Sequence, residues 1–203
     1  MTEPTAEAFH RRVRAHATAD GRLPVPAQAG WEVFPFEPAP LVAKRLEALV
    51  LPEPLRSGEC ASDCSVCADP EERAVWSDQR WLLLREENPV GLPFQAMLCP
   101  RAHLDLGDLA DEHAAELGQL IVRLDRAVRA LDGVERLHVN RWGDGAAHLH
   151  LFLMGRPSGL LQLRGSNLAL WEEMLPRLPR QESDAALHQV AQALAHSSGR
   201  LHS

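Results

Sequence analysis

The sequence predicts a single α+β domain, in which an antiparallel sheet carries one long helix on one side. Short strand-like runs follow one another through residues 74–98 with connections of a few residues, which favours antiparallel pairing. A one-sided apolar stripe then extends from residue 108 to 131, as in a helix packed on one face. Two more strand-like runs, joined by a glycine-containing loop, complete the predicted sheet.

Length and composition limit the possible functions. The chain has 203 residues, enough for one domain with a real core. A formal net charge of -7 without a long Lys or Arg run disfavours a broad nucleic-acid-binding face. The sequence contains neither a membrane-length apolar stretch nor the apolar core of a secretory signal. We therefore expect a cytoplasmic protein that binds a small molecule, with no nucleic-acid or membrane partner.

Three regions are expected along the chain. Residues 1–58 are rich in Pro and should form an N-terminal extension packed on the domain, with a possible strand at residues 31–34. Residues 59–165 should form the main domain, and residues 166–203 a helical C-terminal segment.

The first sheet elements are a hairpin and a third strand. Ala74–Ser77 and Trp81–Leu84 are strand-like runs joined by Asp78-Gln79. Gly91-Leu92-Pro93 then opens a third run, Phe94–Leu98, which ends at the letters "CPRAH".

The long helix and the later elements follow in order. Asp108–Leu131 is predicted as a helix, stopped by Asp132-Gly133, because apolar residues recur on one face at Leu117, Leu120, Ile121, Leu124, Val128 and Leu131. Glu135–Asn140 is predicted as a strand, and Ser183–His196 as a final helix.

Two histidines stand in the last strand-like run, "AHLHLF". Because side chains alternate along a strand, His148, His150 and Phe152 should share one face, and the leucines between them should enter the core. A single histidine there would be read as polar decoration of a half-solvated strand. A pair on one face indicates chemistry, provided that partners come from elsewhere in the chain.

The cysteines allow more than one interpretation. A cytoplasmic chain of this size rarely uses disulfides, so metal binding is the better default for Cys60, Cys64, Cys67 and Cys99. The C-x2-C spacing of Cys64 and Cys67 suits a tetrahedral zinc, with two further ligands supplied by the fold. With Cys60 the pattern is also the iron-sulfur spacing of radical enzymes that cleave S-adenosylmethionine. The strands and single long helix that follow disfavour the partial barrel of those enzymes.

The order of motifs is similar to that of a known superfamily. A C-x2-C knuckle, a hairpin, a strand ending in "PRAH", a long helix, a strand ending in Asn, a Gly loop and "HLHLF" follow one another over residues 60–157. This order resembles the histidine triad superfamily, including its galactose-1-phosphate uridylyltransferase branch. The resemblance implies the same antiparallel sheet with one long helix. It also implies one structural zinc ion per chain, held by Cys64, Cys67, His103 and His148.

The resemblance further implies the chemistry. His150 falls on the family nucleophile, which attacks the α-phosphate of a nucleotide ester, anhydride or phosphoramidate and forms a nucleotidyl-histidine. The expected ligand-binding positions are Asn140, Arg141, Gly143, Phe152, Arg156 and Arg164. Many histidine triad proteins are dimers, so a homodimer is also possible.

Two departures from the family pattern leave alternatives open. The third triad position is Phe152, which can neither donate a hydrogen bond to phosphate nor protonate a leaving group. The loop between Asn140 and His148 is shorter than the family's by about three residues. The chain could therefore be a nucleotidyl transferase or hydrolase, a nucleotide-binding protein with weak or no chemistry, or an enzyme of specialised metabolism that takes another substrate.

Overall fold

The computed structural model describes residues 14–31, 33–37, 41–45 and 48–202. The chain divides into two compact units, Met1–Pro54 and Leu55–Ser203. The second unit thus begins a few residues before the predicted start at residue 59, while the packing of the N-terminal extension stays a prediction.

The first unit contains little regular structure within its described residues. Ala27–Gly30 form a short 3-10 helix (η1), and Arg22 and Arg45 form an isolated antiparallel bridge. The strand expected at residues 31–34 is wrong, because its described residues lie in a turn. The backbone N–H of Phe34 donates to the carbonyl of Trp31 at 2.9 Å and closes this turn.

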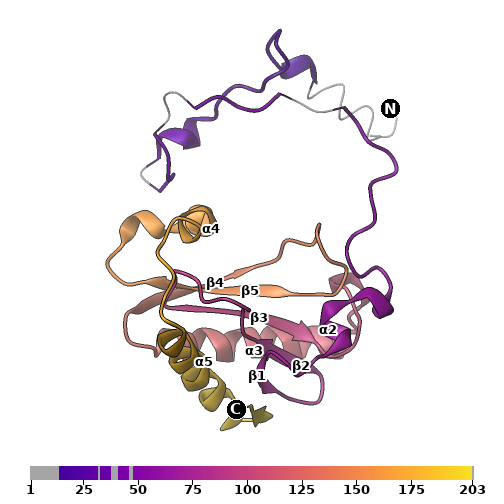
Figure 1. The fold of residues 1–203 in the computed structure, drawn as a ribbon, viewed down its shortest axis with the longest axis vertical. Coiled ribbons are helices and arrows are strands. Elements are labelled where there is room, and N and C mark those ends of the chain that lie inside the picture. The colour runs from indigo at the N-terminus through magenta and orange to yellow at the C-terminus, as the bar shows by residue number, and fades with distance from the viewer. Residues whose placement is uncertain (1–13, 32, 38–40, 46–47, 203) are drawn as a thin grey trace. The chain divides into compact units, whose positions relative to one another are not determined.

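The second unit is built on an antiparallel sheet, which confirms the predicted α+β class (Figure 1). Its six strands lie in the order β4-β5-β3-β2-β1-β6. They are β1 (Ala74–Ser77), β2 (Trp81–Leu84), β3 (Phe94–Pro100), β4 (Val134–Asn140), β5 (Leu151–Pro157) and β6 (Arg200–Leu201). The predicted hairpin is present as β1 and β2. The Asp78 carboxylate closes its turn by accepting from the backbone N–H groups of Arg80 and Trp81.

The helices of this unit are α2 (Ser65–Ala68), α3 (Asp111–Arg129), α4 (Leu168–Glu172) and α5 (Arg180–Ala195). Helix α3 starts later than predicted, because Leu106–Asp108 form a separate 3-10 helix (η3) that is closed by a capping box between Asp105 and Asp108. Shorter 3-10 helices lie at Ala61–Asp63 (η2), Leu161–Leu163 (η4) and Gly165–Asn167 (η5). Among the described residues, no helix has the length and apolar character to cross a membrane.

Helices α3 and α5 cover one face of the sheet and form the main core with it (Figure 1). The predicted apolar stripe of α3 is buried there at Leu117, Leu120, Leu124 and Val128. Helix α5 contributes Leu187, Val190, Ala191 and Leu194, and the strands contribute Trp76, Phe94, Leu98, Leu151 and Leu153 among others.

Two smaller apolar clusters are formed by strand side chains that point to the opposite face of the sheet from the main core. One joins Cys64 and Val66 near α2 to Leu82 and Cys99 of the sheet. The other joins Met154 of β5 to Leu92, Leu163 and Leu168, next to α4. Because side chains alternate along β5, Phe152 and Met154 point away from the face that α3 covers. The candidate site therefore lies on the sheet face opposite α3 and α5.

The short strand β6 was not predicted. It pairs with β1, opposite Trp76 and Ser77, and the preceding Gly199 has a φ of +81°. A Cβ atom at Gly199 would lie 2.5 Å from the Ser77 carbonyl oxygen and 2.7 Å from the Trp76 ring. Glycine is required there because both its backbone angle and the available space exclude a side chain.

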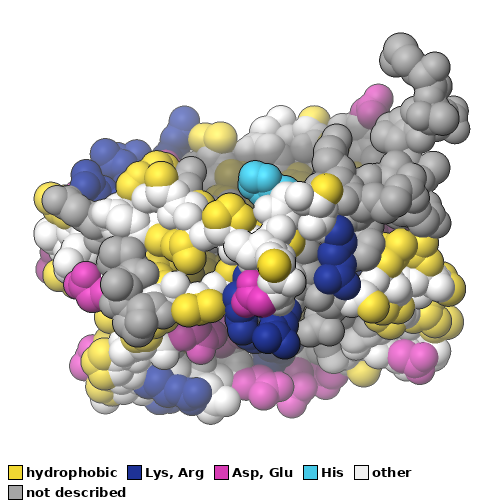
Figure 2. All heavy atoms as spheres, turned by 90° about the horizontal axis from the view of Figure 1, so that it is seen from above, with side chains coloured by type: hydrophobic (Ala, Val, Ile, Leu, Met, Phe, Trp, Pro, Cys, Tyr) yellow, Lys and Arg dark blue, Asp and Glu magenta, His cyan; other side chains and the backbone are white. Residues whose placement is uncertain are grey.

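Figure 2 shows the molecule from above, with side chains coloured by type. Basic, acidic, hydrophobic and histidine side chains are all visible in this view.

Candidate functional site

Two thiols and two imidazoles from separate segments meet in the second unit. Cys64 and Cys67 lie at the start of α2 and within it, His103 follows β3, and His148 precedes β5. One ligand atom from each residue lies within 4.8 Å of the others. The Cys64 Sγ is 3.3 Å from His148 Nδ1, and the Cys67 Sγ is 3.3 Å from His103 Nδ1. The fold therefore assembles the four residues that the resemblance implied as ligands.

The spacing of these atoms fits a tetrahedral metal ion. Bonds of ~2.3 Å to sulfur and ~2.0 Å to nitrogen place neighbouring S and N ligands about 3.5 Å apart in a tetrahedron. The sulfur-to-nitrogen distances are 3.3 Å for two pairs and 3.5 Å for Cys67 with His148. A set of two cysteines and two histidines is that of closed structural sites, which suit Zn²⁺.

The protonation of His148 also suits ligation. Its Nε2 lies 2.8 Å from the Pro100 carbonyl oxygen, which can only accept, so Nε2 carries the proton and Nδ1 presents its lone pair to the thiols. Burial lowers the pKa of His148, although the Pro100 contact opposes this shift, and the ring is held neutral. Burial, followed by the adjacent Cys64, raises the pKa of Cys67. Two neighbouring thiolates would therefore need a cation between them.

The other two cysteines lie outside this cluster. Cys60 is exposed, and Cys99 is buried in the sheet. Burial raises the pKa of the Cys99 thiol to about 12, which keeps it protonated. Within the described part of the chain, Cys60 does not join Cys64 and Cys67, as a three-cysteine iron-sulfur site would require.

Residues just before the knuckle form one wall of the site. The backbone N–H of Ser57 donates to the Gly145 carbonyl at 2.9 Å, and the N–H of Ala147 donates to the Ser57 carbonyl at 3.0 Å. Gly58 has a φ of +70°, and a Cβ there would lie 3.3 Å from the Cα and Cβ of Cys64. These residues were predicted as part of the N-terminal extension, but they hold the loop before His148 against the knuckle.

His150 stands next to the cluster with one ring nitrogen fixed. Its Nδ1 lies 2.8 Å from the His148 carbonyl oxygen and must donate to it, which leaves Nε2 unprotonated in the neutral ring. The regular strand β5 begins only at Leu151, so both histidines precede it, contrary to the prediction. The predicted division of side chains is nevertheless found. Leu149, Leu151 and Leu153 enter the core, while the histidines and Phe152 line one small cavity.

This cavity has a volume of about 140 Å³. Besides His148, His150 and Phe152, it is lined by Ser57, Gly58, Cys64, Ser65, Val66, Arg73, Met97 and Ala146. Arg73, next to β1, brings a guanidinium to the cavity and was not singled out from the sequence. Its distance along the chain from both histidines concealed this proximity.

An aromatic row extends from His150. The ring centroids of His150 and Phe152 are 5.3 Å apart, with planes at 87°, and those of Phe152 and Trp142 are 5.1 Å apart. Trp142 is 46% exposed. Asn140 lies opposite Phe152 in the β4–β5 register, and its Nδ2 donates to Met154 Sδ at 3.4 Å. Phe152 therefore places an apolar ring between His150 and Trp142.

An acidic residue organises the glycine loop. Asp105 accepts from Arg56 Nη1 at 2.7 Å and from Arg141 Nη2 at 2.6 Å, and the same Arg56 nitrogen donates to the Gly143 carbonyl at 3.0 Å. Desolvation opposes ionisation of Asp105, but the hydrogen bonds from Arg56, the Leu106 amide and Arg141 outweigh it and lower its pKa to about 2. The sequence analysis missed both Asp105 and Arg56.

Two predicted ligand-binding arginines lie elsewhere. Arg156 is buried on β5 and donates to the Pro157 carbonyl at 3.1 Å, while Arg164 donates through Nε to the Leu161 carbonyl at 2.8 Å. Neither lines the cavity beside His150. Their binding role stays a prediction, as do the homodimer and the cytoplasmic location.

Comparison with known proteins finds similarity in structure. No family model matches the sequence, and no curated protein matches it. A zinc-bound histidine triad family protein from Mycobacterium smegmatis is 21% identical, with 68% of this chain and 96% of that chain covered and a TM-score of 0.47. A hypothetical histidine triad nucleotide-binding protein from Sulfolobus tokodaii is 17% identical, with coverages of 66% and 91% and a TM-score of 0.47.

A uridylyltransferase is similar over part of its length. It is 22% identical, with 63% of this chain and 42% of that chain covered, at a TM-score of 0.42. Because these TM-scores lie below 0.5, the function is inferred from the side chains of the site.

Proposed function

We propose that the chain is a zinc-binding nucleotidyl transferase or hydrolase of the histidine triad type, with His150 as its nucleophile. The observation that carries this proposal is the 2.8 Å hydrogen bond from His150 Nδ1 to the His148 carbonyl. In the neutral ring, it selects the tautomer whose Nε2 lone pair is available for attack.

The metal cluster would position this ring. With all four positions of a tetrahedral ion taken by Cys64, Cys67, His103 and His148, zinc would brace the fold rather than act as a Lewis acid on substrate. His148 connects the two parts, because its ring belongs to the cluster while its carbonyl orients His150.

The proposed reaction has two displacements at one phosphorus. His150 Nε2 bonds to the α-phosphorus of a nucleotide, and the bond to the leaving group breaks, with the electron pair departing on that group. Water or a second phosphate then attacks the same phosphorus, and the P–N bond breaks with its electron pair returning to the imidazole.

Phe152 limits which leaving groups can depart. Its ring has no proton to give, so the leaving group must depart as a stable anion or take a proton from water. Anhydrides and aryl esters meet this condition better than phosphoramidates, whose amine must be protonated. We therefore expect nucleotides with good anionic leaving groups to be the preferred substrates.

Loop residues would bind the phosphate and the nucleoside. Asn140 ends β4 and Gly143 lies in the loop that leads to His148, where Arg141 is held by its ion pair with Asp105. Arg73 would add a cation from the cavity wall, and the exposed ring of Trp142 would stack on the base or sugar.

The test is a single-turnover reaction with a nucleoside 5′-(p-nitrophenyl phosphate). The wild-type chain should release p-nitrophenolate and carry a nucleotide adduct on His150, located by mass spectrometry. His150→Ala should lose both the adduct and turnover while keeping its metal content. His188→Ala removes an exposed histidine of α5 and should behave as wild type. Full turnover in His150→Ala would refute the mechanism.

A second candidate is a nucleotide-binding protein with little chemistry. It is favoured by the Phe152 ring lying edge-on to His150 at 5.3 Å, where a hydrogen-bond donor would be needed. This candidate predicts that AMP binds measurably while no adduct forms on His150, even with the p-nitrophenyl substrate.

A further inference from the structure

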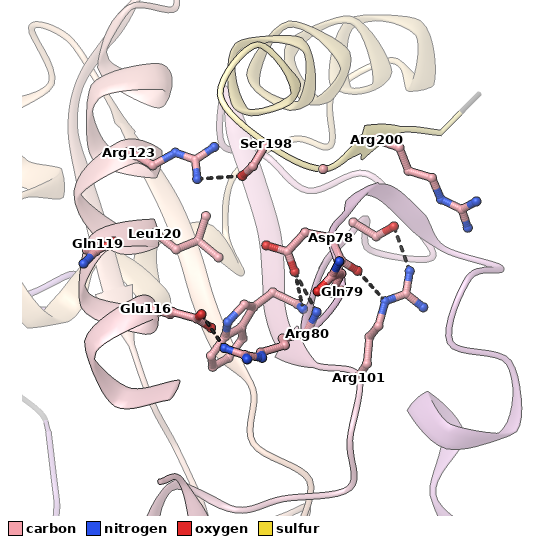
Figure 3. A pocket seen from close by; sticks show the side chains of 13 residues that line it. Asp78, Gln79, Arg80, Arg101, Glu116, Gln119, Leu120, Arg123, Ser198 and Arg200 are labelled. Carbon is pink, nitrogen blue, oxygen red and sulfur yellow. Dashed lines mark hydrogen bonds and ion pairs between the residues drawn. The ribbon is translucent and has the colours of Figure 1, made fainter. Parts of the chain in front are cut away.

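A larger cavity lies away from the histidine site. It has a volume of about 710 Å³, within the range of about 300–1,000 Å³ typical of small-molecule sites. The β1–β2 turn, the residue after β3, helix α3 and the segment after α5 form its walls (Figure 3). It has no lining residue in common with the cavity beside His150.

The inner wall of this cavity is apolar and rigid. Trp81 and Leu120 line it, and they are only 2% and 3% exposed because both belong to the main core. Figure 3 shows Leu120 pointing from α3 into the cavity. These two side chains therefore give the cavity a rigid apolar floor, of which only a small area is exposed.

Most charges around the cavity are already paired. Arg80 pairs with Glu112 and Glu116 of the same wall, and Arg101 and Arg200 both pair with Glu71. The Asp78 carboxylate is engaged by the amides of its own turn. The lining contains four arginines and two carboxylates, so the cavity keeps a positive balance despite these pairs.

Arg123 is different, because its acceptors are uncharged. Its Nη1 donates to Ser198 Oγ at 3.0 Å and its Nη2 to the Leu194 carbonyl at 2.8 Å. Among the described residues, no carboxylate forms an ion pair with it. The Leu194 carbonyl lies in the last turn of α5, so this contact fixes the guanidinium in place. Donors of Arg123 and its full positive charge remain for a ligand.

We propose that this cavity binds a small organic carboxylate, with the carboxylate on Arg123 and Ser198 and the apolar body over Leu120 and Trp81. A bare inorganic anion would leave the apolar wall uncovered, and a neutral molecule would leave the Arg123 charge unpaired. Glu116 lies on α3 with Arg123 but is paired with Arg80, so it does not neutralise Arg123. The proposal does not depend on His150 or on the metal cluster.

The test uses three probes in calorimetric titrations of the full chain. 2-Naphthoate carries both features, 2-naphthamide has the same shape without the charge, and acetate has the charge without the aromatic body. We expect 2-naphthoate to bind with one site per chain, and the other two probes to bind about tenfold or more weakly. Equal binding of naphthoate and naphthamide, or no binding of naphthoate, would overturn the proposal.

Variants locate the bound probe. Arg123→Gln should weaken 2-naphthoate binding about tenfold or more, whereas Arg126→Gln, an exposed arginine of α3 outside the cavity, should leave it unchanged. Ser198→Asp keeps Arg123 and its contact with Leu194 but places a carboxylate beside the guanidinium, so it should also weaken binding. His150→Ala should bind normally. Loss of binding in His150→Ala, or equal effects of Arg123→Gln and Arg126→Gln, would place the probe elsewhere.

Discussion

The candidate site has two halves that differ in completeness. In the metal cluster, four donor atoms from separate segments converge, and a hydrogen bond to Pro100 fixes the orientation of His148. In the half around His150, a hydrogen bond to the His148 carbonyl fixes one ring nitrogen, and the neighbouring Phe152 has no polar side-chain atom. The difference teaches that the two halves can vary separately, since one has a complete set of donor atoms and the other has an apolar ring beside its imidazole.

The largest expected effect comes from the complete half. Cys64→Ala should remove the bound zinc and lower the melting temperature by about 10 °C or more, because metal binding energy is also folding energy. Elemental analysis and thermal unfolding measure both effects. Cys60→Ser is the matched control, since this exposed thiol lies outside the cluster and should leave both values unchanged. Equal loss of zinc in the two variants would contradict the cluster.

The second largest effect should come from adding a proton donor beside His150. Phe152→His restores a proton donor beside His150 and should raise kcat for a nucleoside phosphoramidate about 10²-fold. The increase should be much smaller for the p-nitrophenyl ester, whose leaving group needs no proton. Phe152→Leu changes the ring without adding a donor. If Phe152→Leu raises the phosphoramidate rate as much, proton donation is not what this position lacks.

A third test concerns Asp105, whose ion pairs with Arg56 and Arg141 hold the glycine loop. The pKa of Asp105 falls from its ordinary value of 3.8 to about 2 on folding. Its ion pairs therefore stabilise the fold fully above pH 4, and this contribution is lost as the pH falls toward 2. When the pH falls through this range, the unfolding free energy of Asp105→Asn should therefore decrease by about 1–2 kcal/mol less than that of the wild type.

Urea denaturation at pH 4.5 and pH 2.5 measures this contribution. Asp125→Asn, which removes a carboxylate from an exposed pair with Arg129 on α3, is the matched control. An acid-induced loss of stability in Asp105→Asn as large as in wild type would show that Arg56 and Arg141 do not hold this carboxylate.

The smallest effect on stability should come from Trp142→Ala. This ring is 46% exposed, so its removal should change the unfolding free energy by no more than about 0.5 kcal/mol. If the ring stacks on the nucleoside, the same change should raise KM severalfold while kcat is kept. Trp31→Ala, an exposed tryptophan of the first unit, should alter neither value.

The sequence contained enough to predict the framework of the second unit. Apolar periodicity identified α3, and the short connection at Asp78-Gln79 identified the hairpin, because both are local signals. The four cluster residues were found through the order of motifs rather than through spacing alone. Cys64 and His148 are far apart in the chain, and no local pattern states that they will meet.

Other features were missed because they depend on contacts between distant segments. Arg56 and Asp105 read as ordinary charged loop residues until the fold joins them to Gly143. Arg73 lines the same cavity as His150 only because the fold brings the two segments together, and β6 is too short to show any periodicity. Arg164 was predicted as a ligand-binding residue from its place after the last strand; it follows η4 and does not line the cavity beside His150.

The pairing of β6 with β1 has a practical consequence. Without Arg200 and Leu201, β1 would become the outer strand, and its unpaired backbone groups could recruit a strand from another molecule. The same tail carries the carbonyl of Ser198, which accepts from the buried Trp76 indole N–H at 3.0 Å. Truncation before Ser198 would thus expose the edge of β1 and leave the Trp76 indole N–H without its acceptor. The two residues of β6 therefore protect the backbone groups of β1 from pairing with another molecule.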